Sequence, residues 1–495
     1  MDERDSANLV RRSTNPIMHH AAWTVAAQAF SLGVGLFAMR ILLHSLGPSR
    51  LGVFTLALGL SGFSGLFDFG LGRALTQTVS SSLGAGYRRD QVAAVVWRVL
   101  PLLAGLGAIW LCVLWYSAPW LVTRVFNLRG TLSRESLFGL RAMALSMPFA
   151  LVATAALGSL EGLQQFRLLS LWRMPMSVVQ FGLPAATALV KPDVGWVIAA
   201  LASTRACWCL LWVGQLARLL PLIRGKSASP GELRRTLWFG GWLSVSNLVS
   251  PLMVYADRFY LASVLPTAQI AYYTVTFDAS ARLASLPQVA TNVLFPALAQ
   301  ARVNPEESQR LLNVAIRMLI ACGLPATLTL AVAAHPLLSW WLTPEFAHQA
   351  SSVLQWILVG VLVNSVAHVP YALLQAHGRA DLTAKLHLLE LPAFAAALVW
   401  AVRHWGVEGA AVAWVIRVML DATLLFGVAW RLHGDLRERL RSGFMWIFSA
   451  STTYFLVTFG LPPWLQGWAV AAITCVGLAS ARGALRWVMS RGIER

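Results

Sequence analysis

The sequence predicts an all-α polytopic membrane protein with about 14 transmembrane helices. Its composition is the first reason. Of 495 residues, 57% are hydrophobic and only 12% are charged, and the mean hydropathy is +0.63, which is more apolar side chain than a water-soluble core can absorb. The second reason is that apolar runs of about 20 residues or more, long enough to cross a bilayer as helices, recur along the whole chain between short polar breaks.

The predicted helices begin behind a short N-terminal stretch, residues 1–16, of mixed charge. The first apolar run is too long to be the core of a secretory signal, so it predicts a retained first helix. The clearest polar break is 224–232, "RGKSASPGE", which combines Gly, Ser and Pro with basic residues and predicts a cytoplasmic linker. The predicted helices span residues 17–43, 51–82, 92–122, 136–160, 167–190, 194–220, 233–265, 268–300, 308–341, 347–376, 380–402, 408–432, 440–461 and 464–490.

Basic residues are distributed unevenly among the polar breaks. Lys plus Arg outnumber Asp plus Glu by 39 to 21, and they gather at alternate breaks. The intervening breaks after Leu265, Trp341 and Gly460 contain no Lys or Arg, whereas the break around Arg129 is an exception. The positive-inside rule therefore places both termini in the cytoplasm, which fits an even number of spans. The net charge of +18 is then explained by anionic lipid and does not indicate a nucleic-acid partner.

Motifs for metal, nucleotide or hydrolytic chemistry are missing from the sequence. There is no Gly-rich phosphate loop and no HExxH pair. All five cysteines fall inside apolar runs, and Cys207 and Cys209 point to different faces of a helix, so they do not form a compact metal site. No predicted loop has room for a catalytic domain. We therefore expect no enzyme activity, no cofactor and no metal site.

An internal repeat relates the two halves of the chain. The series Arg40, Pro48 and Phe54 recurs as Arg258, Pro266 and Tyr272 at a constant offset of 218, and "VGWVIA" from Val194 aligns with "EGAAVA" from Glu408 at an offset of 214. Each half has six helices, so the halves keep the same orientation and the implied pseudo-two-fold runs along the membrane normal. Chance similarity is the alternative, since "LGP" and "LPT" are ordinary turn sequences. The predicted domains are a six-helix lobe at 1–223, the linker at 224–232, a second six-helix lobe at 233–436 and two additional helices at 437–495.

Several segments resemble polysaccharide-repeat-unit flippases of the multidrug/oligosaccharidyl-lipid/polysaccharide exporter superfamily. "LLHSLGPSRLGVFTLA" and "LFDFGLGRALTQ" resemble the first two helices of that family, and "YADRFYLASVLPTAQIAYYTV", "LFPALAQ", "LLQAHGRADLTAKL" and "GVEGAAVAW" resemble later ones in the expected order. The resemblance covers helices one to twelve. It implies two six-helix lobes that face each other across a central cavity. One departure is that Ala299 and Gln300 precede Arg302, where members often carry an Arg directly after "LFP".

Charged residues inside the predicted helices are the candidates for function. Each would cost about 2.5–3.5 kcal/mol on lipid, so most must face protein or trapped water. Asp278 with Arg282, and Arg417 with Asp421, are four residues apart and can neutralise each other on one helix face. Structural pairing is the preferred interpretation for the second pair, and both interpretations stay open for the first, which the resemblance places at the cavity wall. Seven charged residues lie well inside the membrane when they are counted from the predicted helix ends: Arg205, Asp278, Arg282, Arg317, Glu390, Arg417 and Asp421.

Other charged residues lie nearer the predicted helix ends. Arg258, next to Asp257, and its repeat partner Arg40 either anchor the helices at the outer interface or flank the outer mouth of the cavity. Asp68 and Arg73 form a gate ion pair or accompany glycines used for close packing. With Arg141 and Arg173 added, the predicted substrate-binding set is Arg282, Arg205, Arg141, Arg173, Arg40 and Arg258, and the predicted gating or charge-pair set is Asp68, Arg73, Asp257 and Asp278.

The resemblance implies a transporter that flips a polyprenyl-diphosphate-linked oligosaccharide from the inner to the outer leaflet of the cytoplasmic membrane, for surface polysaccharide, lipopolysaccharide or O-antigen synthesis. A surplus of intramembrane Arg suits a diphosphate, because guanidinium donors match phosphate oxygens. The implied partners are this lipid-linked substrate and membrane lipids; contact with other polysaccharide-assembly proteins and coupling to Na⁺ or H⁺ are left open. The alternatives are a cation-coupled multidrug exporter, which should prefer an acidic cavity, and a membrane glycosyltransferase or polysaccharide polymerase, which usually needs a large outer loop.

Overall fold

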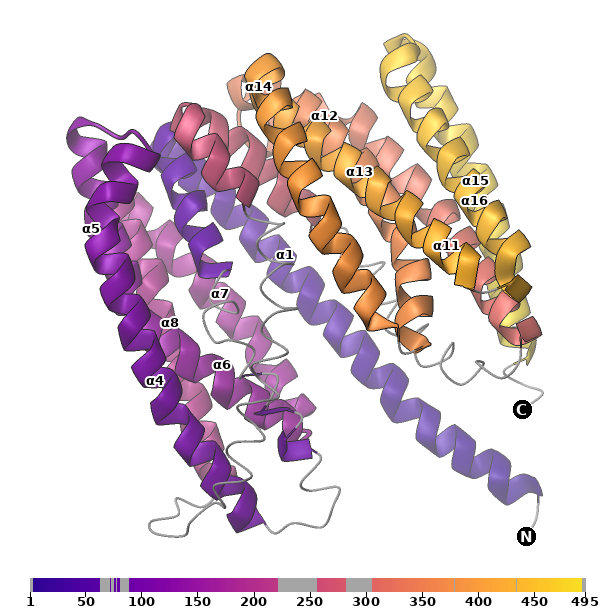
Figure 1. The fold of residues 1–495 in the computed structure, drawn as a ribbon, viewed down its shortest axis with the longest axis horizontal. Helices are drawn as coiled ribbons and strands as arrows, with labels where there is room; N and C mark the ends of the chain where they lie inside the picture. The colour runs from indigo at the N-terminus through magenta and orange to yellow at the C-terminus, as the bar shows by residue number, and fades with distance from the viewer. Residues whose placement is uncertain are drawn as a thin grey trace. The chain divides into compact units, whose positions relative to one another are not determined.

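The computed structural model describes residues 3–62, 72, 75, 76, 78–80, 89–220, 256–281, 305–377, 379–432 and 434–491 (Figure 1). The regular structure within these ranges is helical, with no β-strand. Six of the described helices are long and apolar enough to cross a membrane, or seven if one bent pair counts as a single span. The all-α, multi-pass class predicted from the sequence is confirmed, and the total of 14 helices stays a prediction.

The chain divides into two compact units, residues 1–268 and 269–495. Residues 256–268 therefore belong to the first unit, although they follow the predicted linker at 224–232. Two contacts explain this. Gly52 lies so close to the backbone oxygen of Thr267 that no side chain fits between them, and Asn127 Nδ2 donates to the carbonyl oxygen of Ser263 at 3.2 Å. The boundaries of the two six-helix lobes stay a prediction.

The first unit is built from long helices with sharp, sequence-encoded breaks. Its longest helix bends at Gly47, whose φ of 73° is readily adopted only by glycine, and Pro48 follows directly. This break lies between the first two predicted helices. The elements are α1 (Glu3–Gly62), α4 (Arg89–Trp120), a π-helical turn (Leu121–Val125), α5 (Gly130–Leu145), α6 (Met147–Gly162), α7 (Phe166–Val190) and α8 (Val194–Leu219), followed by helical residues 256–264. A further helical segment, 267–281, begins at the end of this unit, and its residues 269–281 belong to the second unit.

The predicted helix 136–160 is in fact two helices. α5 and α6 meet at Ser146 with a bend of 42°, and Pro148 in the first turn of α6 lacks the N–H that would continue the α5 hydrogen-bond ladder. Gly107 of α4 packs against the backbone of Met147 and Pro148, so the bend is held by close contact with a neighbouring helix.

The core of the first unit lies between α4, α6 and α8. α4 packs against α6, α6 against α8, α5 against α8, and α1 against α7. Val96 and Leu103 of α4, Leu151 of α6 and Leu216 of α8 are completely buried in one apolar cluster. Many large apolar side chains on the outer faces remain exposed, Tyr116 and Val190 among them, as expected for surfaces that face lipid.

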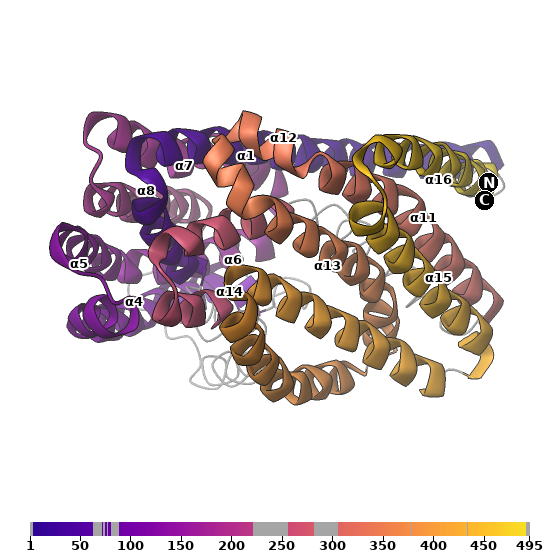
Figure 2. The same cartoon turned by 90° about the horizontal axis from the view of Figure 1, so that it is seen from above.

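The second unit is organised around its most buried helix, α13. This helix packs against α14, α11 and α12, and α16 lies beside α11 (Figure 2). Gly360 of α13 directly contacts the Trp414 ring of α14. α14 turns at Gly406, which has a φ of 56°, between the predicted helices 380–402 and 408–432. The elements are α11 (Pro305–Val332), α12 (Ala334–Trp341), α13 (Pro344–Ala376), α14 (Ala380–Leu432), a 3₁₀ turn (Gly434–Leu436), α15 (Arg437–Phe455), a π-helical turn (Leu456–Gly460) and α16 (Pro463–Arg491).

Candidate functional site

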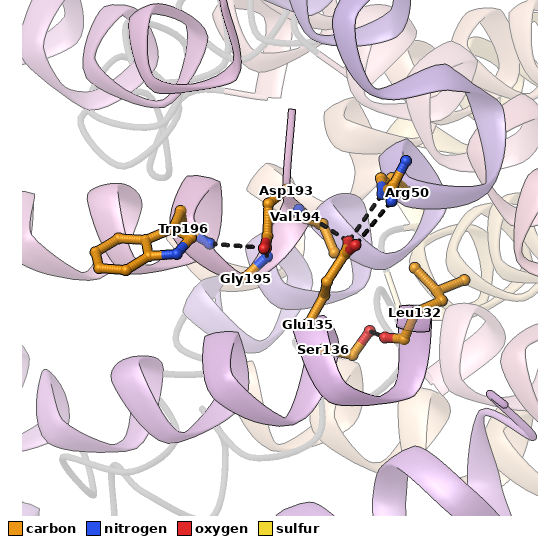
Figure 3. Close-up of polar contacts among 8 residues, drawn as sticks. All are labelled: Arg50, Leu132, Glu135, Ser136, Asp193, Val194, Gly195 and Trp196. Atoms are coloured by element: carbon orange, nitrogen blue, oxygen red, sulfur yellow. Dashed lines mark hydrogen bonds and ion pairs between the residues drawn. The ribbon is translucent and has the colours of Figure 1, made fainter. Parts of the chain in front are cut away.

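The candidate site in the first unit begins with an ion pair that ties three helices together (Figure 3). Arg50 of α1 donates two hydrogen bonds to Glu135 of α5, from Nε to Oε2 at 2.8 Å and from Nη2 to Oε1 at 2.7 Å. The same Oε2 accepts the backbone N–H of Val194, the first residue of α8, at 3.3 Å. Asp193 caps α8 by accepting the N–H of Gly195 at 2.8 Å. We call Arg50, Glu135 and the Val194 N–H the three-helix clamp.

The clamp fixes the register of α5 relative to α8. Ser146 follows Glu135 by eleven residues along α5, and Arg205 follows Val194 by eleven residues along α8, a distance of about 16 Å along each helix. The two residues meet at that depth, since Arg205 Nη1 donates to Ser146 Oγ at 3.3 Å and lies 3.9 Å from the Met147 sulfur. The clamp therefore positions the Arg205 guanidinium against the bend between α5 and α6.

Arg141 lies on α5, between the clamp and this bend. Its guanidinium carbon lies 5.0 Å from the centroid of the Trp115 ring of α4, within the range of a cation–π contact. Its Nε atom is buried and has no hydrogen-bond partner in the described part of the chain. Within the same described residues, neither Arg141 nor Arg205 has a carboxylate partner. The first unit thus holds two guanidinium groups whose described contacts are all uncharged.

The repeat-related arginines lie in the same unit but differ in environment. Arg40 is half-buried on α1. Arg258 is only 2% exposed, and its backbone N–H donates to Asp257 Oδ1 at 2.7 Å. Such burial contradicts the interpretation of Arg258 as an anchor that extends to the outer interface, because that role requires an exposed guanidinium.

The remaining predicted site residues are only partly described. Asp278 is half-buried in the helical segment 267–281. Arg173 lies on α7, but its side chain is not among those described. Asp68, Arg73 and Arg282 lie outside the described residues, so the predicted pairs Asp68–Arg73 and Asp278–Arg282 stay predictions.

Two expectations for the second unit are corrected by the structure. Arg417 and Asp421 do not pair along one helix face; Arg417 Nε lies 3.9 Å from Glu390 Oε2, and His387 Nε2 lies 3.7 Å from Asp421 Oδ1. The cause is the turn at Gly406, which brings the first arm of α14 alongside the second. Arg317 of α11 is exposed rather than directed into protein.

Sequence reasoning missed the clamp. Arg50 and Glu135 are 85 residues apart, and both lie at the ends of predicted helices, where a charged residue is unremarkable. The available signal was "KPDVGW", in which Asp193 stands at a helix N-cap position. That motif locates the start of α8 but does not name the residue that contacts it.

Comparison with known proteins identifies the family. A model of the family described as "Polysaccharide biosynthesis protein" matches residues 41–351, which is more than half of the chain. The chain belongs to the polysaccharide biosynthesis protein family. This family member is 25% identical over 409 residues to a Shigella flexneri protein named "Putative O-antigen transporter", and the match covers 83% of the present chain and 96% of that protein.

Solved structures show which fold this polysaccharide biosynthesis protein has. The lipid II flippase MurJ, in an inward closed conformation, matches with a TM-score of 0.71 at 11% identity, over 95% of this chain and 99% of that one. An inward-facing multidrug resistance MATE family transporter of the MOP superfamily matches with a TM-score of 0.63 at 15% identity, over 87% of this chain and 98% of that one. At such identities the likeness shows a shared fold. The shared all-helical fold agrees with the sequence resemblance, and the two six-helix lobes around a central cavity stay a prediction.

Proposed function

We propose that this protein flips a polyprenyl-diphosphate-linked oligosaccharide from the inner to the outer leaflet of the cytoplasmic membrane, for the synthesis of surface polysaccharide. The family match and the Shigella flexneri relative named as an O-antigen transporter support this class of substrate. In this proposal the protein is a transporter and catalyses no covalent step. The interior of the cell is negative, so outward movement of each substrate negative charge is favoured by about 2.3 kcal/mol per 100 mV.

The observation that carries the proposal is the pair Arg141 and Arg205, two half-buried arginines without a carboxylate partner among the described residues. Burying a cation without a carboxylate partner costs free energy unless another anion neutralises its charge. A diphosphate supplies that charge, and its oxygens accept two parallel N–H bonds from a guanidinium. In this proposal the diphosphate engages Arg141 and Arg205, while Arg40, Arg173, Arg258 and Arg282 stay predicted members of the substrate-binding set.

We further propose that the chain is arranged as two six-helix lobes, 1–223 and 233–436, with both termini in the cytoplasm. Matching breaks support the repeat. α1 bends at Gly47 before Pro48 and helix 256–264 ends at Leu265 before Pro266, while α8 starts after Asp193 and the second arm of α14 starts after Gly406. Contact with other polysaccharide-assembly proteins is part of the same proposal.

Flipping in proteoliposomes tests this function. The full chain is reconstituted with a fluorescent polyprenyl-diphosphate oligosaccharide, and the fraction that reaches the opposite leaflet is measured by quenching. We expect Arg141→Ala and Arg205→Ala to lower substrate affinity about ten- to a hundred-fold, because each removes a hydrogen-bonded charge contact. The matched controls are Arg134→Ala on α5 and Arg218→Ala on α8, both exposed, and these should flip normally.

The outcome separates a polysaccharide flippase from a multidrug exporter. The MATE likeness concerns the fold alone, and the carboxylate-free arginines Arg141 and Arg205 disfavour a cationic drug as the substrate of the first unit. A wild-type chain that moves cationic dyes and leaves the lipid-linked sugar in place would contradict the proposal.

A further inference from the structure

A second group of buried charged side chains lies within α14 and belongs to no part of the proposed substrate site. The first arm of the helix provides His387 and Glu390, and the second provides Arg417 and Asp421. Arg417 Nε lies 3.9 Å from Glu390 Oε2, and His387 Nε2 lies 3.7 Å from Asp421 Oδ1. The Glu390 side chain is completely buried and that of Asp421 is 9% exposed. We call these four residues the hairpin cluster.

The carboxyl groups of the hairpin cluster lack hydrogen-bond donors. Both oxygens of Glu390 and Oδ1 of Asp421 are buried without a hydrogen-bond partner among the described residues. The contacts of Arg417 with Glu390 and of His387 with Asp421 join the two arms of α14 and hold both carboxyl groups in one cluster. Two ionised carboxylates only accept, so neither can donate to the other until one of them carries a proton.

Charge balance gives the number of protons. With both carboxylates ionised, Arg417 cationic and His387 neutral, the cluster carries one net negative charge, and burying such a charge in apolar surroundings is costly. A single proton makes the cluster neutral and supplies the missing donor. Arg417 provides the only fixed positive charge of the cluster, and its Nε lies 3.9 Å from Glu390 Oε2.

Charged and titratable groups of the adjoining elements complete the surroundings. On α13, the His368 ring contacts the Tyr371 ring with centroids 6.2 Å apart, and the Tyr371 ring stacks on His387 with centroids 6.4 Å apart. On α15, the Tyr454 hydroxyl donates to the Gln355 carbonyl. The segment 267–281 also adjoins α14, because its Phe277 ring contacts the Trp414 ring. This segment carries one charged residue near the contact, the half-buried Asp278. Among the side chains that the structure describes, the other charged or titratable residues of α14, α15 and the turn between them are exposed: Lys385, Arg403, His404, Glu408, Arg431, Asp435, Arg437, Glu438, Arg439 and Arg441.

We propose that the hairpin cluster is a proton-binding site, in which Glu390 and Asp421 share one proton and Arg417 limits the number to one. His387 is the route of exchange, because its side chain is the most exposed of the four, at 24%. Chains of carboxylates and histidines inside membrane helices serve as proton relays. We assign this proton as the ion whose movement is coupled to substrate movement, and this assignment rests on the proposed flippase function.

Infrared difference spectroscopy tests the site without any substrate. The full chain in nanodiscs of phosphatidylethanolamine and phosphatidylglycerol is titrated between about pH 5 and 9, and the carbonyl stretch of protonated carboxyl groups is followed. Glu390→Gln and Asp421→Asn should each abolish the titrating band, because the remaining carboxylate and Arg417 are neutral without a proton. Both variants have the charge of the protonated site, so they should fold. Glu408→Gln, an exposed position on the same helix, is the matched control.

Arg417→Gln provides the opposite test. Two carboxyl groups without the guanidinium need two protons, so the band amplitude should be about twice that of the wild type. A titration in which Glu390→Gln leaves the band unchanged would overturn the site. A band that disappears when choline is replaced by Na⁺ at constant pH would overturn it as well, in favour of a sodium site.

The assigned coupling is tested by flipping under an imposed pH gradient. The gradient should change the initial rate several-fold in the wild type and in Glu408→Gln, and should have no effect in Glu390→Gln. An equal response in all three chains overturns the assignment of the coupling ion. A wild type that shows the infrared band but moves no lipid-linked sugar refutes the proposed function and leaves the proton site standing, so the two failures are distinguishable.

Discussion

Arg50 and Glu135 are joined by two hydrogen bonds, Nε to Oε2 at 2.8 Å and Nη2 to Oε1 at 2.7 Å, across 85 residues of sequence. The Glu135 side chain is 8% exposed and also accepts the N–H that starts α8. Arg50→Ala should therefore lower the free energy of unfolding by about 1–3 kcal/mol, because a largely buried carboxylate loses its charged partner. The apparent melting temperature of the purified chain measures the effect.

Two further variants show whether the loss of stability comes from the Arg50–Glu135 ion pair itself or from a general disturbance of the surrounding structure. Arg50→Lys keeps the charge but not the two-bond geometry, so it should fall between wild type and Arg50→Ala. The double variant Arg50→Ala with Glu135→Gln should cost less than the sum of the single changes. Strict additivity would mean that the two residues do not interact in the membrane-embedded protein.

The approach of Gly52 to Thr267 gives a second prediction. A Cβ at residue 52 would overlap the Thr267 backbone, whereas a Cβ at Gly33 on the same helix meets nothing within 4 Å. Gly52→Ala must separate the two segments and should cost about 1–3 kcal/mol of stability. Gly33→Ala should leave the melting temperature unchanged or slightly raised. Equal behaviour of the two variants would show that residues 256–268 do not pack on α1.

The Trp115 ring beneath Arg141 gives a prediction about transport. Trp115→Leu removes a cation–π contact worth about 0.5–2 kcal/mol and frees the guanidinium to adopt other positions. The flipping rate should fall more for Trp115→Leu than for Trp115→Phe, which retains a ring, with equal amounts of protein in the membrane. The control is Trp120→Leu at the exposed end of α4. Full activity of Trp115→Leu would remove this positioning role.

Helix breaks were predictable because local chemistry encodes them. The breaks at Gly47 and Gly406 were predicted to within a few residues, since Gly before Pro, or Gly within a polar break, is visible in the sequence. The α5–α6 bend was only partly visible. Pro148 signalled a flexible point, but the 42° angle also depends on the close contact of Gly107.

Pairings between helices were not predictable, because they depend on which helix faces meet. Sequence spacing predicted that Arg417 would pair with Asp421, but the two arms of α14 present Glu390 and His387 to these residues. The sequence singled out Glu390, which the structure shows to be buried, but it did not predict the partner of Glu390. A spacing of four residues shows only that two side chains share a face of one helix. Which ion pair forms depends on the residues that a second helix brings to that face.

The order of crossings in the second unit supports a final prediction about topology. The predicted outer breaks after Trp341 and Gly460 coincide with observed ends, at Leu342 before α13 and at Leu461 before α16. Six segments separated by breaks, α11 with α12, α13, the two arms of α14, α15 and α16, match the predicted helices 9 to 14. Alkaline phosphatase fused after Thr343 or Leu461 should be active, and green fluorescent protein fused after Asp435 or Arg495 should fluoresce, because basic breaks stay in the cytoplasm. A fluorescent fusion at Thr343 together with an active phosphatase at Asp435 would invert the orientation, and with it the direction in which the membrane potential assists an anionic substrate.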